Sequence, residues 1–162
     1  MGYEPKQEVI HSVELFHDYI RDGRIKLKEK IKVPTTVQDP CNVVRNGGLA
    51  EKNRRLAEMI SEDFRPMKKH GNYNYCCAGG GGAMPMGGEM KKDRLAAGKV
   101  KADQIRETGA KLVLVPCHNC IDQIRDLIKE YKIDAKAVHF KEVIAEHMVI
   151  PEEMLPKEDE AE

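Results

Sequence analysis

Aromatic residues are scarce in this 162-residue sequence, which contains no tryptophan, three phenylalanines and five tyrosines. Proteins that hold single-stranded nucleic acid usually stack its bases on aromatic side chains, and few are available here. The sequence also lacks an excess of either charge, since 27 lysines and arginines face 27 aspartates and glutamates. No net positive charge draws the chain to nucleic acid or to an anionic membrane surface. We therefore expect no nucleic-acid partner.

Long apolar runs are absent as well. The best is "LVLV" at 112–115, which is far shorter than the roughly 20 residues of a membrane-spanning helix. The N-terminal "MGYEPKQEV" has no apolar core of the kind that a signal peptide carries. We expect no direct membrane insertion and a cytoplasmic location, either free or peripheral to a membrane complex.

The size and composition fit one globular domain. A chain of 162 residues is long enough for one hydrophobic core and short for two. The residues are 41% hydrophobic and 33% charged, as in soluble globular proteins. We expect a single domain over residues 1–154 and an acidic, disordered tail over residues 155–162.

Helical and extended patterns alternate along the chain. Apolar spacing predicts helices over 7–22, 47–64, 88–108, 117–131 and 141–149. Short β-branched or apolar runs predict strands within 33–41, 72–77, 111–116 and 135–140. In the helix over 88–108 we expect the charged residues to face outward and Leu95, Val100 and Ile105 to face inward. The alternation predicts an α/β fold, a small and mostly parallel sheet with flanking helices in Rossmann-like βαβ units.

The five cysteines are the chemically distinctive residues. They follow the pattern C-x34-CC-x39-C-x-x-C, formed by Cys41, Cys76, Cys77, Cys117 and Cys120. Each lies at or near the end of a predicted strand, and ligands of open α/β sheets gather at the carboxyl ends of the strands. In a cytoplasmic chain, five cysteines favour metal or redox chemistry over a disulfide framework.

The number of thiols bears on the kind of metal. A structural zinc ion takes four ligands and would leave one of these thiols unused. An iron–sulfur cluster is held by thiolates and offers several metal atoms. In a cluster of open, non-cubane shape a fifth thiolate can bridge two irons, and the adjacent Cys76 and Cys77 can address two neighbouring metal atoms.

Glycines surround the adjacent cysteines in the segment "YCCAGGGGAMPMGG" at 75–88. They allow positive φ angles and remove Cβ atoms where a bulky cluster approaches. Their amide N–H groups are also expected to donate to thiolates or to cluster sulfurs. Cys120 falls in the first turn of a predicted helix, where the helix dipole stabilises a thiolate.

Other interpretations of these motifs stay open. A strand followed by C-x-x-C and a helix is also typical of a dithiol redox pair, here Cys117 and Cys120. The glycine run suggests a phosphate loop, but no Gly-Lys-Ser/Thr follows it, and it does not fit a dinucleotide-binding fingerprint. No catalytic residue is assigned. His118, between two of the cysteines, is the candidate hydrogen-bond donor or proton carrier beside them.

Three segments together resemble a known family. "DPCNVVRNGG", "YCCAGGGGAM" and "LVLVPCHNC" are similar to the cysteine-rich CCG domain. That domain occurs in a subunit of heterodisulfide reductase, in a related subunit of the sulfite reductase complex, and in iron–sulfur subunits of glycolate, lactate and glycerol-3-phosphate oxidoreductases. The resemblance extends over about residues 8–150 and matches the five cysteines one for one to the cluster-binding cysteines of the family.

The resemblance implies an oxidoreductase subunit that carries a non-cubane [4Fe–4S] cluster. In such subunits a disulfide or another sulfur substrate is cleaved at the cluster, with electrons from an iron–sulfur or flavin protein subunit. Relatives usually carry a second CCG domain or a ferredoxin-like domain, and we expect neither here. Gln38 and Ala78 stand where relatives often have His and Gly. Zinc replaces iron in some domains of this class, so a zinc-binding assembly domain stays an alternative.

Overall fold

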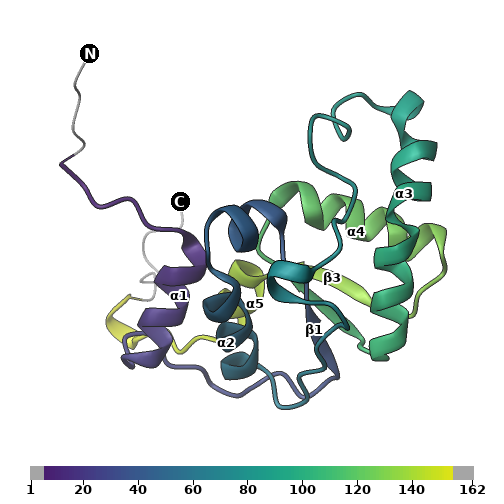
Figure 1. The fold of residues 1–162 in the computed structure, drawn as a ribbon. Coiled ribbons are helices and arrows are strands. Elements are labelled where there is room, and N and C mark those ends of the chain that lie inside the picture. Colours follow the sequence, from purple (N-terminus) through teal and green to yellow (C-terminus); the bar gives the residue numbers. More distant parts are fainter. Residues whose placement is uncertain (1–5, 155–162) are drawn as a thin grey trace, which may run out of the picture.

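Three short parallel strands form the centre of the molecule. The structure is a computed structural model that describes residues 6–154. Strands β1 (Thr35–Val37), β2 (Leu112–Val115) and β3 (Lys136–His139) pair in the order β1-β2-β3 (Figure 1). Both pairings are parallel, and Leu114 lies opposite Val37 on one side and Val138 on the other. The predicted α/β fold with a small parallel sheet is confirmed.

Five α-helices cover the two faces of this sheet. They are α1 (Ser12–Arg21), α2 (Ala50–Ile60), α3 (Gly88–Thr108), α4 (His118–Glu130) and α5 (Phe140–His147). Successive residues of a strand point to opposite faces. Leu114 packs with apolar residues of α1, α2 and α5, whereas Val113 and Val115 pack with residues of α3 and α4. The result is a three-layer arrangement with the sheet in the middle (Figure 1).

The first helix is shorter than its apolar pattern predicts. Val9 and Ile10 are exposed, and the helix begins at Ser12. The imidazole of His11 accepts a hydrogen bond from the Val13 amide, and Glu14 accepts one from the His11 amide. This reciprocal cap satisfies amides at the start of the helix and fixes where it begins.

The strand predicted over 72–77 is wrong. This segment begins within a single 3-10 turn, Gly71–Tyr73, and pairs with no strand in the described part of the chain. Its polar groups bond elsewhere: the Asn74 side chain donates to the Asp39 carbonyl oxygen, and Arg45 donates to the Asn74 carbonyl oxygen. Hydrogen bonds to the segment around Cys41 take the place of a strand ladder.

Helix α3 has the predicted bounds but buries different side chains. Leu95 and Ile105 face inward as predicted, whereas Val100 is 49% exposed and its neighbour Lys101 is 1% exposed. Arg94 is also buried, where it pairs with Asp126 of α4. The expectation that all charges of this helix face outward is therefore wrong.

Two further predictions concern the membrane and the C-terminus. Of the helices in the described residues, none combines the length and the apolar character needed to cross a bilayer. The predicted acidic tail at 155–162 lies outside the residues that the structure describes.

Candidate functional site

The parallel sheet positions two of the cysteine segments. Cys41 follows β1 and leads into one turn of π-helix, Asn42–Asn46. Cys117 follows β2 and is the N-terminal cap of α4, and Cys120 lies in the first turn of that helix. Because β1 and β2 are parallel neighbours, their carboxyl ends bring both segments to one edge of the sheet.

A buried aspartate joins the Cys41 segment to the one that carries Cys76 and Cys77. The Asp39 carboxylate accepts hydrogen bonds from Asn53 Nδ2 at 2.8 Å and from the Gly71 amide at 2.7 Å. Asp39 is 3% exposed, so these bonds replace the water that it loses. The sequence predictions assigned no role to Asp39. The signal for this positioning role was a carboxylate immediately before Pro-Cys, just after a β-branched strand.

Cysteines from two distant segments meet at this edge of the sheet. The sulfurs of Cys77 and Cys120 are 3.1 Å apart, and Cys120 lies in the first turn of α4, three residues after Cys117. Cys76, the neighbour of Cys77 in the chain, is exposed. All five cysteines are free thiols. Residues far apart in the sequence are thus brought together at this edge.

The environment divides the thiols into thiolates and neutral partners. The hydrogen bond from Cys120 lowers the pKa of Cys117 to about 6, and the amides of Cys120 and Asn119 add to this effect. A hydrogen bond from the same thiol lowers the pKa of Cys77 to about 7. The pKa of Cys120 is raised by its hydrogen-bonding interactions with Cys117 and Cys77 and by burial. Burial raises the pKa of Cys76, although the Ala78 amide opposes this effect.

Backbone amides of the glycine segment donate to the adjacent cysteines, as the sequence predicted. The Ala78 amide lies 3.2 Å from Cys76 Sγ, and the Gly79 amide lies 3.5 Å from Cys77 Sγ. Ala78 itself has φ of +67°, in the left-handed region that favours glycine. Gly81 and Gly82 also have positive φ angles. Beyond them the loop stands away from the sheet before α3 begins (Figure 1).

The sulfurs of Cys77 and Cys120 are closer together than metal ligands are. Sulfurs around a tetrahedral zinc ion, with Zn–S bonds of about 2.3 Å, are about 3.8 Å apart, whereas Cys77 and Cys120 are 3.1 Å apart. Among the described residues, no three His, Cys, Asp or Glu side chains are grouped as a metal ion requires. The donor set itself consists of soft sulfur atoms, which suit iron–sulfur clusters and zinc. To hold a cluster or a zinc ion, the sulfurs of Cys77 and Cys120 must move apart, while the backbone segments that carry them stay in place.

The ring of His118 lies at the surface next to the cysteines. Its side chain is 87% exposed, and Nε2 lies 3.9 Å from a carboxylate oxygen of Asp122. The positive charge of protonated His118 contributes to the low pKa of Cys117, as the smallest of its causes. His118 therefore influences Cys117 through charge and stays a candidate proton carrier.

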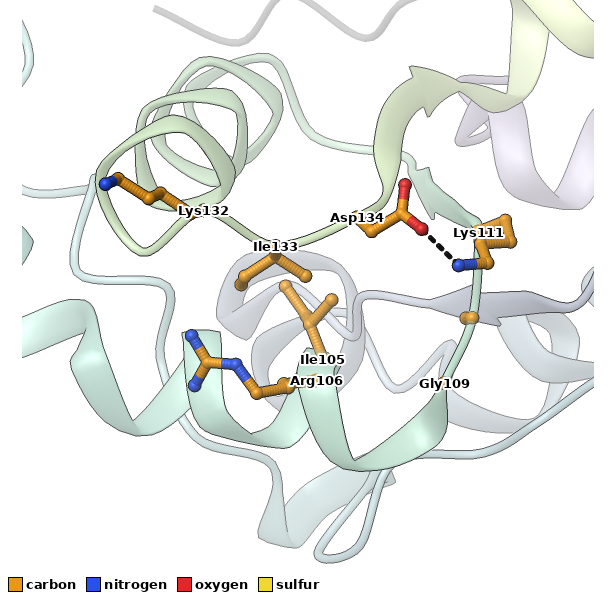
Figure 2. A pocket seen from close by; sticks show the side chains of 8 residues that line it. Ile105, Arg106, Gly109, Lys111, Lys132, Ile133 and Asp134 are labelled. Atoms are coloured by element: carbon orange, nitrogen blue, oxygen red, sulfur yellow. Dashed lines mark hydrogen bonds and ion pairs between the residues drawn. The ribbon is translucent and has the colours of Figure 1, made fainter.

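The pocket in Figure 2 lies at the other edge of the sheet. It has a volume of about 310 Å³ and is lined by residues that precede β2 and β3, including Gly109, Lys111 and Asp134. Lys111 donates a hydrogen bond to Asp134 across its mouth. Ligands of open α/β sheets bind at the carboxyl ends of strands, and this pocket is at the amino ends. It is therefore separate from the cysteine site.

The division of pKa values predicts which thiol reacts first. In reduced, metal-free protein at pH 7, iodoacetamide is expected to modify Cys117 about tenfold faster than Cys76, because the reactive form is the thiolate. The rate at Cys117 should fall as the pH falls through 6, since its thiolate is then protonated. Peptide mass spectrometry after timed quenching measures both rates. Faster modification of Cys76 would contradict this division.

Comparison with known families identifies the domain. The model of the CCG cysteine-rich domain family matches residues 35–125, which include all five cysteines and more than half of the chain. An α/β domain with thiols gathered at the carboxyl edge of its sheet is thus a member of a defined class. The chain belongs to the CCG cysteine-rich domain family, and the predicted resemblance is confirmed.

Three longer proteins illustrate what this chain is similar to. A probable membrane-anchored ferredoxin of Chromohalobacter salexigens is 28% identical over 85% of this chain. One subunit of the dihydromethanophenazine:CoB–CoM heterodisulfide reductase of Methanosarcina mazei is 25% identical over 90% of it. An iron–sulfur subunit of the Hdr-like menaquinol oxidoreductase of Archaeoglobus fulgidus is 26% identical over 71%. The chain spans 20%, 35% and 21% of the lengths of these relatives, respectively.

Proposed function

We propose that this domain binds one iron–sulfur cluster, a non-cubane [4Fe–4S] centre, and serves as a redox module of a heterodisulfide-reductase-like complex. The ligands in this proposal are Cys41, Cys76, Cys77, Cys117 and Cys120. The single observation that carries it is the arrangement at the carboxyl edge of the sheet, where Cys77 and Cys120 are 3.1 Å apart and the segments of Cys41 and Cys117 follow β1 and β2. The names of the relatives, a ferredoxin and two subunits of redox enzymes, support the same chemistry.

The residues around the thiols suit an anionic metal centre. Amides of Ala78 and Gly79 and the start of α4 place positive ends of dipoles at the sulfurs, which stabilises thiolates. When bound, the cluster supplies metal atoms that take up a substrate sulfur and pass single electrons. Cys76 is exposed and Cys77 is buried, so the adjacent pair links the surface to the interior of the site.

Reductive cleavage of a disulfide-type substrate is the reaction that we propose. The reaction converts one disulfide into two thiols and consumes two electrons and two protons. A reduced iron–sulfur or flavin protein subunit supplies the electrons, and water or an exposed group such as His118 supplies the protons. A hollow of about 470 Å³, lined by Lys69, His70, Tyr73 and Tyr75, lies on the segment that leads into Cys76. It offers cationic and aromatic groups to a substrate.

A metal-free dithiol oxidoreductase is the second candidate function. Cys117 has a pKa of about 6 and a hydrogen bond with Cys120, as a nucleophilic thiol and its partner would. This function requires only the C-x-x-C pair and leaves Cys41, Cys76 and Cys77 without a role. A zinc-binding assembly domain is the third, and it uses four of the five thiols. The cytoplasmic location, free or at a membrane complex, stays a prediction.

Metal and sulfide analysis of anaerobically purified wild-type protein tests the proposal. We expect brown protein with about four iron and four sulfide per chain, and a paramagnetic signal in one redox state. Colourless protein with one zinc and no sulfide would replace the cluster with a structural metal site. Colourless protein without metal that reduces disulfides would support the dithiol function.

A further inference from the structure

A lysine is completely buried in helix α3. Lys101 is 1% exposed and is the largest of the fully buried side chains in the described residues. Its ammonium nitrogen lies 3.6 Å from the sulfur of Met67. Within residues 6–154, no carboxylate is within 4.0 Å of it. Buried ammonium groups are costly unless a negative charge or good acceptors compensate them, so this one calls for an explanation.

The surroundings of Lys101 lead to the cysteine site. Met67, which Lys101 contacts, packs in one buried cluster with Cys77 and Cys120. The helix that carries Lys101 also approaches Cys77 closely, since a Cβ atom on Gly98 would lie 3.1 Å from the Cys77 carbonyl oxygen. The ammonium group is therefore buried against the cluster that contains Cys77 and Cys120.

Negative charges at the site oppose the cost of burying Lys101. Burial lowers the pKa of Lys101 to about 8, and Asp39 and the ionised forms of Cys77, Cys120 and Cys76 oppose this effect, in that order. The Asp39 carboxylate already accepts hydrogen bonds from Asn53 and the Gly71 amide. The remaining partners are three of the five thiols, and each becomes fully anionic when it ligates a metal.

We propose that Lys101 is the buried counter-charge of the thiolate-bound centre. This inference rests on the proposed function because it requires a bound metal centre. It does not depend on which metal is bound. With five thiolates bound, a nearby ammonium group offsets part of the negative charge, strengthens metal retention and favours the state with one more electron. In this role Lys101 touches neither the substrate nor a metal ligand. It is a positioning residue whose positive charge acts on the metal centre at a distance.

The test compares Lys101→Met with wild type in three measurements. Met removes the charge and preserves most of the volume beside Met67. In cluster-loaded protein we expect the equilibrium for one-electron reduction to become about tenfold less favourable, which is about 59 mV more negative. Loss of metal to a chelator should be at least tenfold faster. Metal-free Lys101→Met should unfold at the same temperature as wild type or higher, because the variant buries no charge.

Three further variants control the comparison. Lys99→Met removes an exposed lysine of the same helix, which pairs with Asp103, and should leave the potential and metal retention unchanged. Lys101→Arg keeps the charge and should stay close to wild type in both. Lys101→Gln replaces Lys101→Met if the latter does not fold.

The outcomes separate this inference from the proposed function. Wild-type iron and sulfide content decides the proposed function, whereas the difference between wild type and Lys101→Met decides the role of Lys101. If the wild-type protein holds only zinc, chelator-induced zinc loss becomes the deciding measurement. Equal potential and retention in Lys101→Met and wild type would overturn the inference. Unfolding of both neutral variants without metal would also overturn it, because Lys101 would then serve the fold.

Discussion

Cys41→Ser is expected to lower the iron retained per chain at least tenfold in protein purified under anaerobic conditions. The proposed centre uses all five thiolates, and a serine hydroxyl is neutral at pH 7 and a poor ligand for an iron–sulfur cluster. Cys41 is half-buried four residues after the end of β1, and serine has nearly the same shape. The variant should therefore fold as wild type does and fail in metal binding alone. Iron and sulfide assays, with the visible absorption spectrum, measure the effect.

A neighbouring substitution provides the matched control for Cys41→Ser. Asn42→Ser introduces the same side chain one residue later at an exposed position, where it removes a hydrogen bond with Asn46. It should retain the full amount of iron. Thermal unfolding of the metal-free proteins shows whether either substitution changes the stability of the fold.

The alternatives give different results for the same variant. A dithiol enzyme depends on Cys117 and Cys120, so Cys41→Ser would keep its disulfide-reducing activity and Cys117→Ser would lose it. A four-thiolate zinc site would keep its zinc in one of the five single variants. Full iron content in Cys41→Ser would contradict a five-thiolate cluster.

The sheet and its helices were predictable because their signals are local. "KLVLVP" is a continuous apolar run of the kind that a buried parallel strand requires, and β2 is the central strand. The helix over 88–108 has its predicted bounds because glycines flank it, with Gly109 in a left-handed conformation at its end. The cysteines after β1 and β2 followed from the rule for the carboxyl edge of parallel sheets.

The segment of the adjacent cysteines was not predictable in this way. Its conformation depends on hydrogen bonds to Asp39 and Arg45, which are about thirty residues away in the sequence. A run such as "NYNYCC" has extended character by itself, and only those distant partners decide that it pairs with no strand. The glycine that relatives often have after the cysteines is alanine here, yet Ala78 adopts the positive φ angle that the loop requires.

The side chains that α3 buries were also out of reach of pattern reasoning. Its apolar residues are too few to define one face, and hydropathy places lysine outside by default. Lys101 is inside, and the charges of Asp39 and of ionised thiols oppose the cost of its burial. A sequence pattern shows how apolar each residue is. It does not show which charged groups lie near that residue after folding.

Gly79→Ala is expected to destabilise the protein by about 3 kcal/mol. A Cβ atom on Gly79 would lie 2.6 Å from Cβ of Gln123 and 3.0 Å from the carbonyl oxygen of Asn119. Gln123 cannot withdraw easily, because it is fully buried and its Nε2 donates to the Arg94 carbonyl oxygen at 2.9 Å. The backbone of the cysteine segment must therefore shift away from α4, so that the support that positions Cys77 relative to Cys120 no longer stays in place. We also expect metal retention to fall at least tenfold.

The adjacent glycine distinguishes this steric effect from a general intolerance of the loop to substitution. A Cβ atom on Gly80 meets nothing within 4 Å, and its φ angle is outside the positive range. Gly80→Ala should change the free energy of unfolding by no more than about 0.5 kcal/mol and keep its metal. Urea unfolding of the metal-free proteins and iron analysis of the loaded ones measure both effects. If Gly80→Ala is as damaging as Gly79→Ala, contact with α4 is not the reason that glycine is needed at position 79. If only Gly79→Ala loses stability and iron, the packing of Gly79 on Gln123 is what holds Cys77 beside Cys120.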